Sequence, residues 1–92
     1  KPKGVVLLHK GRDDLVVSFD VFVKKGSRLP AGIELYDAKY CPHVREFLEK
    51  HPEYEYVGSE DLAHPYPHSA LILLDIIKLA KQGFEVTCAT GK

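Results

Sequence analysis

The chain has little of several residue types that would identify its class. It contains two cysteines, no methionine and no tryptophan, and its 13 basic residues balance 13 acidic ones. Two cysteines are too few for the disulfide framework of a small secreted protein, so we expect a reducing, cytoplasmic environment. The balanced charge argues against a nucleic-acid-binding domain, which usually carries a basic excess.

Membrane and targeting signals are missing as well. The sequence has no run of about 18 apolar residues, so no transmembrane helix is predicted, and no block of like charges indicates a membrane surface. The segment KPKGVVLLHKG lacks the apolar stretch and the cleavage site of a signal peptide. Because the chain begins at Lys1 and has no methionine, we expect a processed product or, more simply, a domain excised from a longer protein.

The composition that remains is that of a globular domain. The 92 residues are 45% hydrophobic and 28% charged, without the extremes that mark disorder. A chain of this length forms one domain, here residues 1–92, and leaves little room for a second. Its core is small, and therefore marginal unless something reinforces it.

The first third of the chain has the pattern of a β-hairpin. Residues 4–10 (GVVLLHK) form a short apolar run, and residues 15–25 (LVVSFDVFVKK) alternate between apolar and polar side chains. Alternation of period two is typical of a strand, and the polar turn at 11–14 is short enough to join antiparallel strands. Residues 33–37 (IELYD) are a candidate for a third, brief strand.

A short helix and a further strand follow. Residues 41–52 (CPHVREFLEKHP) show the apolar spacing of a helix. Pro42 suits a first helical position, because its missing N–H has no intrahelical partner there. Residues 53–58 (EYEYVG) alternate again, and the two prolines within 59–68 exclude a regular helix.

The last quarter predicts a second helix and a last strand. Residues 69–82 form the helix, with His68 or Ser69 as its N-cap and Gly83 as its left-handed C-terminal residue. Residues 84–88 (FEVTC) form the strand. The predicted fold is a small single α+β domain: a four- to five-stranded, largely antiparallel sheet with two helices packed on it.

The second helix is apolar nearly all the way round. Asp75, Lys78 and Gln82 give it one narrow solvent stripe, whereas a helix on a sheet needs an apolar arc of only about 100°. One interpretation is that the extra apolar side chains are core, covered by the long 26–40 loop. The other is an association surface, because an exposed apolar patch otherwise promotes aggregation. The second interpretation places an interface at Leu73, Ile76 and Ile77.

Two tyrosines are further candidates for that interface. Tyr54 and Tyr56 lie on one face of the predicted strand at 53–58. Tyrosine combines a large apolar area with a polar tip, a combination found at protein interfaces. We include both in the predicted interface, while core packing is the alternative explanation.

Cys41 is the first candidate for chemistry. The order strand, Cys-Pro turn, helix and strand superficially resembles the opening of a glutaredoxin or glutathione transferase, in which a helix N-terminus stabilises the thiolate. Val44 stands where a C-x-x-C motif has its second cysteine, and no cis-proline signature follows. Thiol chemistry at Cys41 is therefore an alternative, and an ordinary cysteine near a helix start is the simpler interpretation.

A zinc site is another alternative. Cys41, His43, His64 and His68 supply four groups of the kind that zinc binds. The C-x-H spacing at a helix start is unusual for zinc, and the last two histidines bracket two prolines, so ordinary surface residues explain them as well. We predict no metal and no other cofactor.

No catalytic motif is present in the sequence. The patterns G-x-G-x-x-G and G-x-S-x-G are absent. The paired acidic residues fall in turns or loops, where turn chemistry explains them without catalysis: Asp13 and Asp14, then Glu60 and Asp61. We therefore lean against an enzyme.

One family resemblance lies in the C-terminal part. EYEYV (53–57), a proline-bearing loop and ILLDIIKLAKQGFEVTCATGK (72–92) resemble the C-terminal half of the GTP cyclohydrolase feedback regulatory protein. They are also similar to the C-terminal domains of the KCTD family of BTB-domain proteins. The matching positions are Leu74, Ile77, Leu79, Gly83, Phe84, Val86 and Gly91. The resemblance implies a small α+β domain that assembles into a ring and binds proteins rather than catalysing a reaction.

These observations together predict a non-catalytic interaction or regulatory module. It would self-associate or dock a protein partner, with no nucleic acid and no membrane involved. A thioredoxin-like thiol module at Cys41 and a small-ligand-binding regulatory domain are the alternatives.

Overall fold

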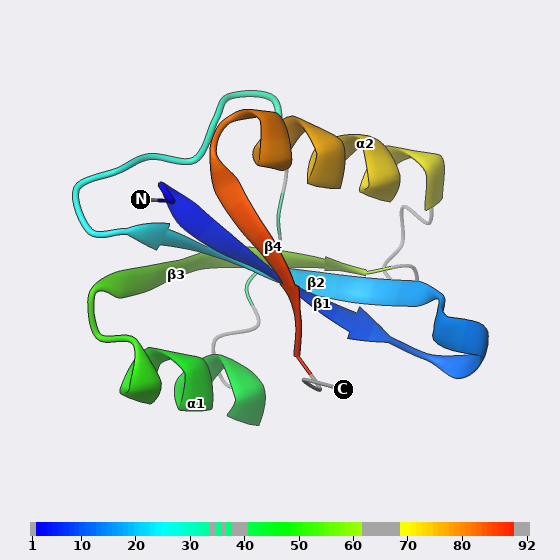
Figure 1. Ribbon diagram of the computed structural model, residues 1–92, viewed down its shortest axis with the longest axis horizontal. Coiled ribbons are helices and arrows are strands. Elements are labelled where there is room, and N and C mark those ends of the chain that lie inside the picture. The colour runs from blue at the N-terminus through cyan, green and yellow to red at the C-terminus, as the bar shows by residue number, and fades with distance from the viewer. Residues whose placement is uncertain (1, 34, 36, 38–40, 62–68, 90–92) are drawn as a thin grey trace.

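The computed structural model shows a four-stranded sheet with a helix on each side (Figure 1). It describes residues 2–33, 35, 37, 41–61 and 69–89, and for 69–73 the backbone alone. In chain order the elements are β1 (Gly4–Lys10), the 3-10 turn η1 (Arg12–Asp14), β2 (Val16–Lys24), α1 (Pro42–Lys50), β3 (Tyr54–Asp61), α2 (Ser69–Lys81) and β4 (Phe84–Cys88). The predicted α+β class is confirmed.

The strands lie in the order β3-β2-β1-β4. β2 pairs antiparallel with both β1 and β3, as the hairpin pattern predicts, whereas β4 pairs parallel with β1. A parallel pair needs a crossover connection, and α2 supplies the helical part of it between β3 and β4. Within the described ranges, the sheet therefore has four strands and is antiparallel in two of its three pairings.

The candidate strand at 33–37 is not a strand at its described positions. Ile33, Leu35 and Asp37 have no strand pairing, and residues 34 and 36 lie outside the described part of the chain. Ile33 is buried in the core, and Leu35 packs against the same cluster. The prediction was wrong because apolar residues at alternate positions also suit an irregular segment that covers a core.

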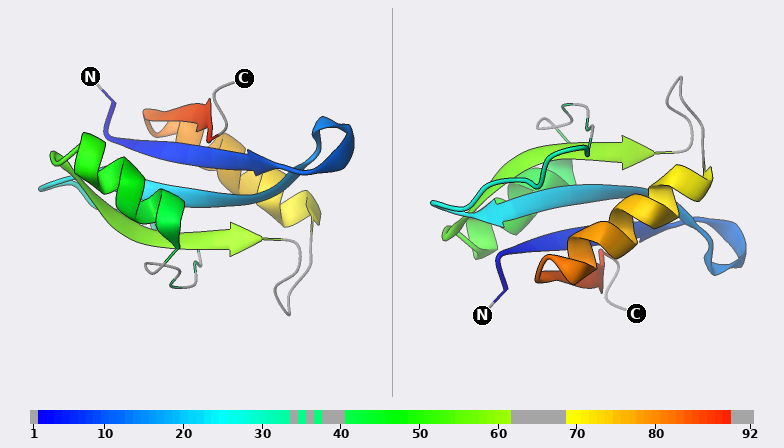
Figure 2. Two further views of the ribbon diagram at one scale, coloured as in Figure 1. Left: turned by 90° about the horizontal axis from the view of Figure 1, so that it is seen from below. Right: turned by 90° about the horizontal axis from the view of Figure 1, so that it is seen from above.

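The two helices cover opposite faces of the sheet (Figure 2). Alternation along β2 turns Phe19, Val21 and Val23 toward one face and Phe22 toward the other. The larger core cluster contains Leu79 of α2, and its members are Val6, Phe19, Val21, Val23, Ile33, Leu79 and Phe84. The alternation of side chains along β2 thus divides its apolar residues between two cores, one on each face of the sheet.

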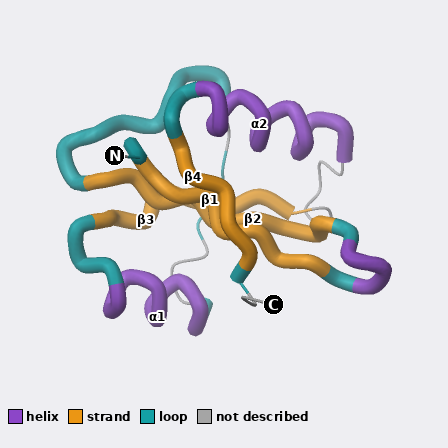
Figure 3. Tube along the Cα trace, viewed as in Figure 1, coloured by secondary structure: helices purple, strands orange, loops and turns teal. Residues whose placement is uncertain are grey.

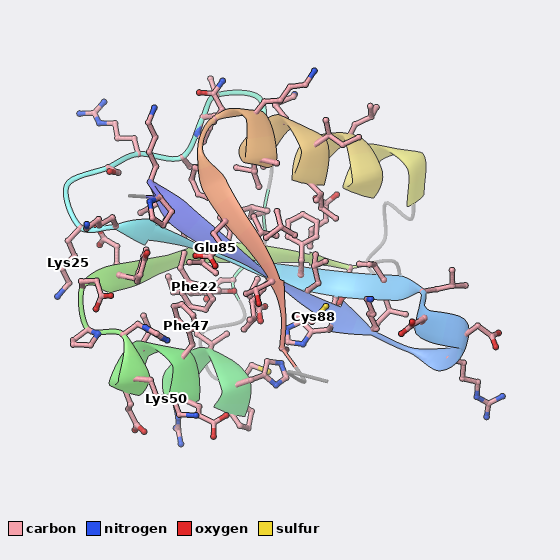
Figure 4. The ribbon with its side chains drawn as sticks, in the orientation of Figure 1. Phe22, Lys25, Phe47, Lys50, Glu85 and Cys88 are labelled. Atoms are coloured by element: carbon pink, nitrogen blue, oxygen red, sulfur yellow. The ribbon has the colours of Figure 1, made fainter. Side chains whose placement is uncertain are left out.

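The smaller core lies under α1. Leu7, Phe22 and Val44 are buried there, and the rings of Phe22 and Phe47 stack with their centroids 4.1 Å apart. Figure 4 shows these two rings pointing toward one another from the sheet and the helix. Stacking adds about 0.5–1.5 kcal/mol to the burial of two rings, so this pair is a main attachment of the nine-residue helix.

The helix termini follow the predicted signals. Pro42 is the first residue of α1, and Cys41 precedes it as N-cap in an extended conformation. Gly83 follows α2 with φ 99°, and its N–H donates to the Ala80 carbonyl. Glycine adopts this left-handed conformation without the strain that a Cβ would bring. Across the described residues, neither helix has the length and apolarity to cross a membrane.

Candidate functional site

The outer side of α2 carries two apolar and two basic side chains in one row. Leu74 is 55% exposed and Ile77 is 50% exposed, and Lys78 and Lys81 are exposed beside them. Residues three, four and seven positions apart share one face of a helix. We call these four residues the α2 stripe.

The inner side of α2 packs on the sheet. Leu79 is fully buried, and Ile76 is partly buried against the same core. The predicted solvent stripe is therefore correct for Lys78 and Gln82, which are exposed, but wrong for Asp75, which is half-buried. Asp75 lies one turn before Leu79, so the burial of Leu79 turns Asp75 toward the sheet as well.

Asp75 meets a second carboxyl group on β3. Its side chain is hydrogen-bonded to that of Glu60, and Glu60 Oε1 is buried without a hydrogen-bond partner among the described residues. Burial, together with the neighbouring Asp75 carboxylate, raises the pKa of Glu60 from 4.5 to about 7. Glu60 therefore holds its proton at weakly acidic pH and donates it to Asp75.

The tip of the β1–β2 hairpin is the second exposed surface. Asp13 and Asp14 have φ of 60° and 64°, a left-handed conformation that aspartate tolerates better than most residues. Leu15 is 65% exposed and Val17 is 40% exposed. We call these four residues the hairpin tip; Figure 3 shows the helical turn η1 at this end of the molecule.

The structure separates the two parts of the predicted interface. Ile77 lies on the α2 stripe, while Ile76 packs against the core. Tyr54 and Tyr56 are half-buried on the opposite face of the sheet, in the cluster under α1. The side chain of Leu73 lies outside the described residues.

A polar network lies on the α1 side of the sheet, around the buried Asp20. His9 Nε2 donates to Asp20 Oδ2 at 2.6 Å, and Ser59 Oγ donates to Asp20 Oδ1. Since the Ser59 proton is used there, the Tyr56 hydroxyl donates to Ser59 Oγ, at 2.6 Å. Both oxygens of this buried carboxylate are thus satisfied, as its burial requires.

Two further side chains adjoin this network from the start of α1. Cys41 Sγ lies 2.8 Å from His43 Nε2, and the His43 ring lies 4.3 Å from the His9 ring between centroids. The ligand-type atoms of His9, Asp20 and His43 all lie within 4.8 Å of one another. We call these three residues the His-Asp cluster.

The cluster overlaps only in part with the zinc set considered from the sequence. Cys41 and His43 are brought together as that set requires, while His64 and His68 lie outside the described residues. His9 and Asp20 were missed because only the antiparallel register of β1 and β2 brings them together. The available signal was Asp20 itself, an acidic residue between the apolar residues Phe19 and Val21 of β2.

The two cysteines do not form a disulfide. Cys41 and Cys88 are both free and half-buried, and Cys88 ends β4, as labelled in Figure 4. A C-x-x-C dithiol is absent from this helix start, where Val44 is buried in the core under α1.

Comparisons of the chain with family models, curated proteins and solved structures found no match. The resemblance to the GTP cyclohydrolase feedback regulatory protein and to KCTD domains therefore stays a prediction.

Proposed function

We propose that this domain is a non-catalytic protein-interaction module that self-associates, with the hairpin tip of one copy docked on the α2 stripe of another. One observation carries the proposal: the chain exposes two surfaces of complementary composition. The α2 stripe combines two apolar residues with two lysines, and the hairpin tip combines two apolar residues with two aspartates, which outnumber the neighbouring Arg12 of the same turn.

The apolar side chains supply the attraction. Leu74 and Ile77 each leave half or more of their surface exposed, and Leu15 leaves 65% exposed. Removing such surface from water is the main favourable term in association, at roughly 25 cal/mol per Å². Both surfaces are exposed in the same molecule, so they do not cover one another within one copy. A second copy supplies the missing cover.

The charged side chains supply the orientation. Lys78 and Lys81 stand opposite in sign to Asp13 and Asp14, and the Asp14 side chain is 88% exposed. Its ion pair with Lys10 spans 3.9 Å on the surface, a kind of contact that contributes little. Opposite charges across an interface set its register and speed association. A contact between two different patches is heterologous: each copy that docks its hairpin tip still offers its own α2 stripe to a further copy. The same contact can therefore repeat from copy to copy.

The test is the solution mass measured by light scattering across a concentration series. We expect the 10.3 kDa chain to give a multiple of its own mass. The double variant Asp13→Lys, Asp14→Lys and the double variant Lys78→Glu, Lys81→Glu should each be monomeric, because each places like charges across the contact. An equimolar mixture of the two variants should associate again, since every tip then finds a stripe of opposite charge on the other variant.

The matched control reverses two exposed acidic residues elsewhere. Glu46→Lys, Glu49→Lys on α1 makes the same change in net charge as the hairpin variant, away from both surfaces. It should associate like the unmodified chain. An unmodified chain that stays monomeric at every concentration would overturn the proposal. So would a mixture of folded variants that stays monomeric, with folding checked by circular dichroism.

A further inference from the structure

We propose that His9, Asp20 and His43 bind a transition-metal ion, zinc by preference, between α1 and the sheet. Their ligand-type atoms already lie within 4.8 Å of one another, although the residues come from β1, β2 and α1. The site is on the face of the sheet opposite to α2, so it does not depend on the proposed self-association (Figure 2).

The donor set selects the class of ion. Two imidazole nitrogens and one carboxylate oxygen suit zinc and its transition-metal neighbours, whereas magnesium and calcium prefer sites made of oxygen alone. In a tetrahedral zinc site the bonds are about 2.0–2.2 Å long, which places ligand atoms roughly 3.4 Å apart. His9 Nε2 and Asp20 Oδ2 are hydrogen-bonded at 2.6 Å, so zinc has to replace the shared proton and move these two atoms about 0.8 Å apart. His43 is exposed and can move the remaining distance.

The surroundings of Asp20 hold the carboxylate in place. Its residue surface is only 4% exposed, and Ser59 and Tyr56 form a hydrogen-bonded chain behind it. Partners of this kind orient a metal ligand and are worth about 10–100-fold in metal affinity. A bound cation also compensates the negative charge of this buried carboxylate.

Cys41 supplies the fourth ligand in this proposal. Its Sγ lies 2.8 Å from His43 Nε2, at the N-cap of α1, but outside the group of atoms that lie within 4.8 Å of one another, so it has to approach the cluster when the metal binds. A thiolate from this position gives zinc the fourth ligand that closed, structural sites have. Two ligands from the start of α1 and two from the sheet would then join the short helix to β1 and β2. Metal binding would stabilise the fold, because the unfolded chain lacks the assembled site.

The experiment is a titration of the metal-free chain with Zn²⁺ in competition with a chromophoric chelator. We expect one zinc ion per chain and a higher melting temperature with zinc. His9→Gln, Asp20→Asn and His43→Gln should each lose the binding, and Ser59→Ala should weaken it by about 10–100-fold. His51→Gln is the matched control, since His51 is exposed at the other end of α1 and should leave binding unchanged.

Cobalt tests the role of Cys41 separately. Co²⁺ bound to a thiolate shows a sulfur-to-metal charge-transfer band, and we expect this band in the unmodified chain and its loss in Cys41→Ser. If the unmodified chain lacks the band, the assignment of Cys41 as a ligand is wrong.

Two results would overturn the site itself. The first is the absence of zinc binding by the metal-free chain. The second is binding that survives His43→Gln and His9→Gln but is lost in the double variant His64→Gln, His68→Gln. His43 is exposed, so His43→Gln remains informative even where the buried Asp20→Asn fails to fold.

Discussion

The carboxyl pair between β3 and α2 should make the domain less stable as the pH rises. Glu60 and Asp75 share a hydrogen bond that exists only while Glu60 keeps its proton, and its pKa is raised from 4.5 to about 7 by burial and by Asp75. Above pH 7 both groups are ionised and repel each other across the junction of helix and sheet. Replacing Glu60 by glutamine removes this repulsion, because the amide donates to Asp75 at any pH.

The magnitude follows from the size of the pKa change. At about 1.4 kcal/mol per pKa unit, a rise from 4.5 to about 7 corresponds to at most about 3–4 kcal/mol. Glu60 is only half-buried, so water screens part of the interaction, and we expect about 1 kcal/mol. For a domain of this size, that amount shifts the melting temperature by about 4–8 °C.

The sign of the effect follows from proton binding. Below pH 4.5 Glu60 is protonated in both the folded and the unfolded chain, so it does not lower the free energy of unfolding. Between pH 4.5 and 7 the unfolded chain releases the proton while the folded chain keeps it, and the free energy of unfolding falls as the pH rises. Above pH 7 the free energy of unfolding has fallen by the full amount, because Glu60 is then ionised in both states. Glu60→Gln should therefore be more stable than the unmodified chain at pH 8 and similar to it at pH 4.

The assay is thermal unfolding at pH 4, 6 and 8, at one protein concentration because self-association would also shift the melting temperature. Glu55→Gln is the control, an exposed glutamate on the same strand that should not alter the pH profile. If the melting temperatures of Glu60→Gln and the unmodified chain differ by the same amount at pH 4 and pH 8, the carboxyl pair does not act as described.

Four further substitutions test the packing by urea unfolding. Gly4→Ala would place a Cβ 2.3 Å from the Phe22 carbonyl oxygen and 2.4 Å from the Phe84 ring, and should cost at least the ~1–3 kcal/mol typical of overpacking. Leu79→Ala should cost about 2–5 kcal/mol, because the side chain is fully buried. Ile77→Ala should cost under ~1 kcal/mol in the monomer, and an equal loss in these two variants would contradict the orientation of α2. Phe22→Ala should cost about 3–5 kcal/mol by removing the ring beneath α1.

Much of the local structure could be predicted because its signals are local. Alternation predicted the β1–β2 hairpin, Pro42 the start of α1, and Gly83 the end of α2. The strand at 33–37 failed for the same reason: alternation shows that side chains on one side are buried, but not that a neighbouring strand is present. Ile33 is buried without any strand pairing.

The candidate sites depended on information that a sequence does not display. An apolar helix has no unique buried side until it packs, so the sequence placed the exposed Ile77 and the core-packed Ile76 in one interface. For the same reason the exposure of Leu74 and the contact of Asp75 with Glu60 could not be predicted. Likewise, the parallel pairing of β4 with β1 arises from the crossover connection through α2. Hydrophobic periodicity and composition do not specify which strand β4 joins after that connection.

The sequence by itself determined both helices, the start of α1, the end of α2 and the approximate positions of the four strands, because backbone preferences and hydrophobic periodicity act over a few residues. It did not determine the length of β3, which runs to Asp61 where a loop was predicted. Only the tertiary structure decided which face each helix covers and which distant side chains meet. Asp20, His9 and His43 converge because strand pairing and helix docking bring together positions far apart in the chain. That convergence comes from the packing of whole elements, and no short segment of the chain encodes it.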